Sequence, residues 1–142
     1  ACVYVDYAHT PDALRAALDA LRPHTNGKLH LVFGCGGDRD TEKRREMGAI
    51  AQNLADQVIV TDDNPRSEDP AKIRQNVLSA CPGGHDVADR KEAITLAVSE
   101  LMAGDLLVVA GKGHEQVQTV GDLAVPFDDV SACREALKGV KK

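Results

Sequence analysis

Aromatic residues are scarce in this chain of 142 residues, which has two Tyr, two Phe and no Trp. Aromatic rings bury more apolar area than other side chains, so Val, Leu, Ala and Ile must fill any core. Hydrophobic residues make up 43% of the chain, which is enough for one core. Because two domains of half this length would each bury too little surface, we predict a single domain over residues 1–142.

Paired cysteines and long apolar runs are also missing. The four Cys are far apart and form no CxxC pair, which is typical of buried, reduced thiols rather than of a zinc site or a disulfide framework. No apolar run is long enough to cross a membrane, and no targeting peptide is recognisable. We therefore expect a cytoplasmic monomer with no membrane contact, whose apolar opening residues suggest a segment of a longer protein.

Positive charge is in deficit, because 17 Lys and Arg face 22 Asp and Glu, for a net charge of -5. Nucleic acids and anionic membranes are bound through an excess of Lys and Arg. The balance argues against both partners, although a local basic cluster can still bind a small anion.

The order of apolar patterns favours an α/β fold. Short apolar runs predict strands at 2–6, 29–33, 57–60, 85–87 and 105–110, and helical spacing predicts helices at 11–21, 42–55, 69–81, 89–102 and 131–137. Strands that alternate with helices form crossover units. We therefore predict a Rossmann-like, mainly parallel sheet with helices on both faces, a hairpin at 116–119 and 124–127, and an antiparallel edge strand.

Four polar loops follow predicted strands, at residues 6–9, 34–40, 63–66 and 111–115. Ligands of open parallel sheets bind outside the carboxyl ends of the strands. We therefore expect these loops to share one rim and to form a site.

The glycine-rich loop at 34–40 suits close approach of backbone amides to an anion. It lacks the dinucleotide fingerprint, because Arg39 stands where a third Gly would fall, and the chain has no Gly-Lys-Ser/Thr phosphate loop. The alternative is a tight turn in which Arg39 is solvated or pairs with Asp38 or Asp40.

The loop at 63–66 combines a carboxylate, an amide and a guanidinium around a stiff Pro65. Asp63 can hold an ammonium group, while Arg66 can bind a carboxylate through two hydrogen bonds, with Asn64 between them. The alternative is an ordinary turn in which Asp63 bonds to its own backbone.

The two remaining loops carry further candidates. Gly111 makes its loop pliable, Lys112 can pair with a phosphate or carboxylate, and Glu115 can pair with an amine. Asp6 can accept hydrogen bonds from a ribose, and His9 can contact a phosphate or a base. The alternatives are a polar loop that leads into a hairpin and a surface histidine.

Together these motifs resemble the C-terminal domain of Mur ligases, above all the members that add meso-diaminopimelate. The resemblance rests on 6–12 (DYAHTPD), 34–40 (GCGGDRD), 62–66 (DDNPR) and 111–115 (GKGHE), with a further match at 89–94 (DRKEAI). Four motifs in this order, over almost the whole chain, are highly specific.

The resemblance implies roles for single residues. Asn64 and Arg66 would bind the carboxylate-bearing distal end of meso-diaminopimelate, and lysine-adding relatives lack this Arg. Arg39 would bind a carboxylate, and Gly111 and Glu115 would hold the distal end.

The resemblance also implies a reaction. Asp6 and His9 would touch ATP, which phosphorylates the D-glutamate carboxylate of the UDP-MurNAc-dipeptide before the amine of diaminopimelate attacks. ATP and Mg2+ would be held mainly by a central domain, and the UDP-sugar by an N-terminal one, neither of which this chain contains. We therefore expect the chain to be inactive alone.

Two other functions remain open at this point. One is a related ligase with another acceptor, such as a lysine-adding or folylpolyglutamate-type enzyme, from which Arg66 distinguishes the chain. The other is a stand-alone module that binds a nucleotide or an amino acid.

Overall fold

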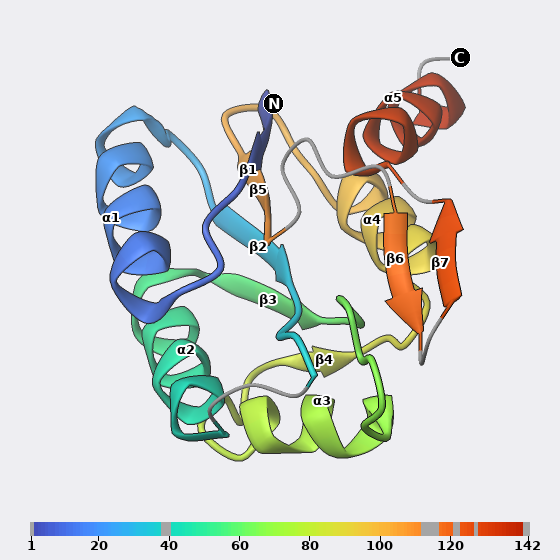
Figure 1. Ribbon diagram of the computed structural model, residues 1–142. Coiled ribbons are helices and arrows are strands. Elements are labelled where there is room, and N and C mark those ends of the chain that lie inside the picture. The colour runs from blue at the N-terminus through green and yellow to red at the C-terminus, as the bar shows by residue number, and fades with distance from the viewer. Residues whose placement is uncertain (1, 38–40, 112–116, 121–122, 127, 141–142) are drawn as a thin grey trace.

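A parallel sheet between two layers of helices forms the body of the molecule (Figure 1). The computed structural model describes residues 2–37, 41–111, 117–120, 123–126 and 128–140. The sheet strands are β1 (Cys2–Asp6), β2 (Leu29–Phe33), β3 (Gln57–Val60), β4 (His85–Asp86) and β5 (Leu106–Ala110). The α-helices are α1 (Pro11–Leu21), α2 (Thr41–Leu54), α3 (Pro70–Leu78), α4 (Arg90–Ser99) and α5 (Asp129–Val140), and a short 3-10 helix, Arg22–His24, follows α1.

The sheet has the strand order β1-β5-β2-β3-β4, and all its described pairings are parallel. Its two faces bury separate clusters of apolar side chains. Leu31 and Phe33 of β2 pack with α1, α2 and α3, whereas Val32 packs with α4 and α5 on the opposite face. Because successive side chains of a strand point to opposite faces, the unbroken apolar run of β2 needs cover on both. The predicted α/β fold with helices on both faces is confirmed.

The antiparallel strands differ from the prediction. The hairpin exists, as β6 (Val117–Val120) and β7 (Leu123–Pro126), but these strands form a two-stranded sheet of their own. The predicted antiparallel edge strand of the main sheet is therefore wrong, and β1 and β4 are the edges. The two strands pair with each other, and a hairpin gives each strand a partner without any bond to the main sheet.

Helix starts follow the capping signals of the sequence. Thr10, Asp69 and Asp89 each accept a hydrogen bond from a backbone N–H in the first turn of α1, α3 and α4, as N-cap side chains do. Several predicted helix bounds differ by two or three residues, since α3 ends at Leu78 rather than residue 81 and α5 ends at Val140 rather than Leu137. Helix α4 ends at Ser99 rather than Met102, and α5 begins at Asp129 because the Asp128 side chain accepts bonds from the Val130 N–H and the Ser131 hydroxyl.

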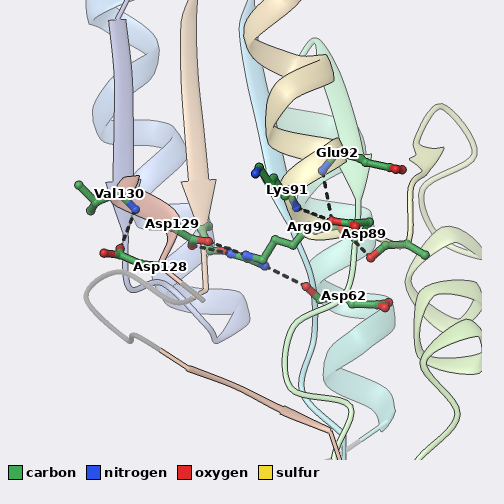
Figure 2. Close-up of polar contacts among 11 residues, drawn as sticks. Asp62, Asp89, Arg90, Lys91, Glu92, Asp128, Asp129 and Val130 are labelled. Atoms are coloured by element: carbon green, nitrogen blue, oxygen red, sulfur yellow. Dashed lines mark hydrogen bonds and ion pairs between the residues drawn. The ribbon is translucent and has the colours of Figure 1, made fainter. Parts of the chain in front are cut away.

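A buried ion pair joins the two helices of the second layer to the sheet (Figure 2). The Arg90 side chain at the start of α4 donates from Nε and Nη2 to the two carboxylate oxygens of Asp129, each at 2.7 Å. It also donates to the carbonyl oxygens of Ala110 at 2.9 Å and Asp62 at 3.2 Å. One guanidinium therefore fixes the carboxyl ends of β5 and β3 against α5.

Arg90 keeps its charge although both side chains of the pair are completely buried. Burial disfavours the charged guanidinium, but the hydrogen-bonded Asp129 carboxylate outweighs this effect and raises the pKa of Arg90 above its usual value. A buried charge with a full set of partners is tolerated, whereas one that has lost its partner is costly.

We expect Asp129→Ala to lower the free energy of unfolding by about 3–5 kcal/mol, because it leaves the buried Arg90 charge unpaired. Urea denaturation measures this loss. The matched control is Glu135→Ala, which removes the exposed Lys91–Glu135 pair between the same two helices and should cost less than about 1 kcal/mol. Equal losses in the two variants would contradict this account.

Candidate functional site

One cavity of about 470 Å³ opens beyond the carboxyl ends of four neighbouring strands. It takes lining residues from the loops that follow β1, β2, β3 and β5, together with the first turns of α2. The lining residues are Tyr7, His9, Thr10, Gly34, Cys35, Gly36, Lys43, Arg44, Met47, Asp63, Asn64, Arg66 and Gly111. The described parts of the four polar loops share one rim, as the sequence predicted; from the last loop this part is Gly111 alone.

The strand order explains why the cavity forms here. After β1, β2 and β3 the chain passes to α1, α2 and α3 on one face, whereas the helix that follows β5, after the hairpin, is α5 on the other face. Strand β5 lies between β1 and β2, so connections to opposite faces diverge beside it. Such a reversal leaves a crevice at the carboxyl edge, which is where open α/β sheets bind their ligands.

Two of the loops are held together by one backbone and one side-chain hydrogen bond, and we call this pair of segments the clasp (residues 34–37 and 63–66). The Gly37 N–H donates to Asn64 O at 2.6 Å, and Arg66 Nη1 donates to Gly37 O at 3.0 Å. A Cβ atom on Gly37 would lie 1.8 Å from Pro65 O. Gly37 is therefore needed for the approach of a neighbouring loop, which is a different use from the anion contact that the sequence suggested.

The backbone of Arg66 has an unusual conformation. Its φ of 52° is positive, and among the residues that the structure describes it is the one non-glycine in this region. A non-glycine residue held there costs on the order of 1–3 kcal/mol and persists where its surroundings enforce it. The clasp supplies this enforcement, and it aims the half-buried Arg66 side chain at the cavity.

Asp63 brings a buried carboxylate to the side of the cavity near β5. It is 7% exposed, and its Oδ2 atom lies 3.6 Å from where a Cβ atom on Gly111 would be. Gly111 has a φ of 114°, and the same Cβ would lie 3.9 Å from Arg90 Nη2. The acidic group therefore lies near the buried ion pair. A Cβ atom at 111 would make only ordinary contacts there, so it is the positive φ, and not a lack of space, that favours glycine.

The loop after β1 presents an imidazole of defined tautomer. His9 Nδ1 lies 3.0 Å from Tyr7 O, and because a carbonyl oxygen only accepts, this nitrogen carries the proton. In the neutral ring Nε2 is then an acceptor. Asp6 is used differently, since its carboxylate accepts the Ala8 N–H at 3.2 Å and it is not among the cavity-lining residues.

Cys35 lines the cavity as a thiol. Burial, with a smaller contribution from the negative charge of Asp63, raises the pKa of Cys35 to about 12. The thiol is therefore protonated near neutral pH, and Cys35 acts as a small apolar side chain in the wall.

Arg44 and Lys43 line the cavity but were missed as site residues, because they stand in a charged run at the start of a helix. Arg44 is buried at 3% exposure and donates to Gly36 O at 3.2 Å and to the Glu68 carboxylate. A signal was present: Met47 and Ala51 follow Arg44 at helical spacing and are also buried, so the period places Arg44 on the inward face.

Three predicted site residues, Arg39, Lys112 and Glu115, lie outside the residues that the structure describes. Within the described part of the chain, no group of three or more His, Cys, Asp or Glu is arranged to hold a metal ion. The described helices include none that is long and apolar enough to span a bilayer.

Fold and cavity together define an α/β ligand-binding domain with its site at the carboxyl edge of a parallel sheet. The family profile described as "Mur ligase, glutamate ligase domain" matches residues 1–113. The chain belongs to the Mur ligase family, as the sequence motifs indicated.

Similar proteins point to one branch of this family. The chain is 62% identical, over 137 residues, to a protein of Caulobacter vibrioides named UDP-N-acetylmuramoyl-L-alanyl-D-glutamate--2,6-diaminopimelate ligase, and the match covers 96% of this chain and 28% of that protein. A solved structure of a ligase of the same name is 43% identical with a TM-score of 0.93, covering 99% of this chain and 30% of that one. The chain therefore spans less than a third of the length of these relatives.

A more distant structure shows how widely the fold is used. A Mycobacterium tuberculosis folylpolyglutamate synthase, solved with ADP and AMPPCP, has a TM-score of 0.59 at 20% identity, over 77% of this chain and 26% of that one. At this identity the likeness shows the fold alone.

We expect Gly37→Ala to lower the free energy of unfolding by about 1–3 kcal/mol, because the added methyl group overlaps Pro65 O and forces the clasp apart. Chemical denaturation measures the change. The control is Gly139→Ala in α5, where a Cβ atom would meet nothing within 4 Å. This substitution should leave the free energy of unfolding unchanged or raise it by up to about 1 kcal/mol. A Gly37→Ala variant as stable as the parent chain would show that the clasp is not tight.

Proposed function

We propose that this chain is the amino-acid-binding domain of an ATP-dependent ligase that adds meso-diaminopimelate to UDP-MurNAc-L-Ala-D-Glu in peptidoglycan biosynthesis. The observation that carries the proposal is the single cavity that collects Asp63, Asn64, Arg66 and Gly111. The names of the similar ligases support the same acceptor.

The chemistry of the cavity fits a zwitterionic ligand. Meso-diaminopimelate differs from lysine by one carboxylate, so a fixed guanidinium is the natural discriminator between them. Arg66 is held by its bond to Gly37 O, and little side-chain freedom is then left to lose on binding. In this proposal Asn64 and Arg66 bind the distal carboxylate, while the buried Asp63 faces an ammonium group.

Four further contacts belong to the proposal. Arg39 binds a carboxylate, Gly111 and Glu115 hold the distal end of the amino acid, and Lys112 meets a phosphate or a carboxylate. Pro65 contributes by stiffening the loop that carries Asn64 and Arg66.

The nucleotide side of the site involves the loop after β1. His9 lines the cavity, and its Nε2 is free of the Tyr7 contact that fixes the tautomer. We assign His9 and Asp6 to contacts with ATP. No described residue is assigned to Mg2+, which with most of the ATP and the UDP-sugar would be bound by other parts of the ligase.

The reaction that follows is acyl transfer. ATP phosphorylates the D-glutamate carboxylate, and the amine of meso-diaminopimelate attacks the acyl phosphate, which releases phosphate and forms an amide bond. This chain would contribute by positioning the substrate: it holds the attacking amine in one orientation, so that a bimolecular reaction becomes effectively unimolecular. The protein would act in the cytoplasm, as a monomer.

Activity is best measured in a grafted ligase, the Caulobacter vibrioides relative with its matching segment replaced by this chain. We expect Arg66→Ala in the grafted ligase to lower kcat/KM for meso-diaminopimelate by on the order of 100-fold, the cost of a lost charge-assisted contact. The KM for ATP should stay within about twofold, because the proposal assigns Arg66 to the amino acid and not to the nucleotide.

The matched control is Arg15→Ala, which changes an exposed arginine of α1 and should alter neither constant. A parent grafted ligase that uses lysine as readily as meso-diaminopimelate would contradict the proposed acceptor. Retention of selectivity in Arg66→Ala would contradict the role given to Arg66.

A further inference from the structure

Arg44 lies between the two loops, after β2 and after β3, that form two walls of the cavity. It lies in the first turns of α2, and its side chain is buried at 4% exposure. It donates through Nη2 to Gly36 O in the loop after β2 and to the Glu68 carboxylate in the loop after β3. One buried cation therefore touches both loops that form the clasp.

Each of these contacts is close to a residue of the clasp. Gly36 precedes Gly37, whose N–H and carbonyl bind the opposite loop. The Glu68 N–H donates to Pro65 O at 3.0 Å, so a tight turn connects Glu68 to the segment that carries Asn64 and Arg66. A shift of Arg44 would therefore be passed to both sides of the clasp.

The Arg44 guanidinium makes few hydrogen bonds in the described structure. Arg44 Nε is buried and has no hydrogen-bond partner among the described residues, so the side-chain bonds that the structure shows for this group are those to Gly36 O and Glu68. A lysine in its place keeps the charge, but its point-like ammonium cannot reproduce the planar, multi-donor geometry of a guanidinium. Glu68 is one-third exposed, so its amide variant removes the charge of the partner with little change in packing.

We propose that Arg44, through Glu68 and Gly36, is a positioning residue that sets the distance between the two walls of the amino-acid cavity and so controls binding of meso-diaminopimelate. This inference rests on the proposed function. Arg44 need not touch the substrate: it holds the clasp, and the clasp orients Asn64 and Arg66.

The test uses Arg44→Lys, Glu68→Gln and the double variant in the grafted ligase, with steady-state constants for meso-diaminopimelate and ATP. We expect each single variant to raise the KM for meso-diaminopimelate by about tenfold or more, while kcat stays within about threefold and the KM for ATP within about twofold. The KM of the double variant for meso-diaminopimelate should be no more than about threefold above that of the single variant with the higher KM, because both changes break the same contact.

Arg45→Lys is the control, since this neighbouring arginine of α2 is exposed and should leave all three constants unchanged. Thermal unfolding of every variant is recorded, and the constants are measured well below each midpoint. If Arg44→Lys does not fold, Glu68→Gln alone decides the matter.

The outcomes separate this inference from the proposed function. A parent grafted ligase that does not use meso-diaminopimelate overturns the proposed function and the inference with it. An active parent whose Arg44→Lys and Glu68→Gln variants keep the KM for meso-diaminopimelate overturns the inference alone. Equal changes in both KM values and in kcat would show a general structural role and would also overturn it.

Discussion

The buried ion pair between Arg90 and Asp129 is the constraint on which the site depends. Its guanidinium binds the carbonyl oxygens of Ala110 and Asp62 as well as the Asp129 carboxylate, so it fixes the ends of two strands that start cavity loops. Both groups are completely buried, and such a pair is stable only while every partner is present. The buried Arg90 charge therefore fixes the positions of the two loops that carry Asp63 and Gly111.

Above this foundation the cavity is shaped by close contacts between loops rather than by long side chains. Gly37 lets one loop touch Pro65 of the next, and Arg66 adopts a positive φ that the contact enforces. Strain of this kind is tolerated where it orients a functional group. Under the proposed function, this arrangement would select between two amino acids that differ by one carboxylate, because a fixed guanidinium discriminates better than a mobile one.

Much of this organisation was predictable from the sequence, for physical reasons. The buried run of β2 and the capping residues Thr10, Asp69 and Asp89 are local signals, and they predicted the sheet layers and the helix starts correctly. The shared rim followed from strand polarity. Long-range partners were not predictable: neither the pairing of Arg90 with Asp129 nor the contact of Gly37 with Pro65 leaves a local pattern. The wrongly predicted antiparallel edge strand has the same cause, because local patterns do not say which strands pair. The roles of Arg39, Lys112 and Glu115 stay predictions.

The central claim is that the cavity binds meso-diaminopimelate with its distal carboxylate on Arg66. A crystal structure of the grafted ligase with meso-diaminopimelate and a non-hydrolysable ATP analogue tests it most directly. The account predicts the amino acid in the cavity, with one carboxylate within hydrogen-bond distance of the Arg66 guanidinium and of Asn64, and an ammonium group facing Asp63. An amino acid bound elsewhere, or bound here with its distal carboxylate turned away from Arg66, would contradict it.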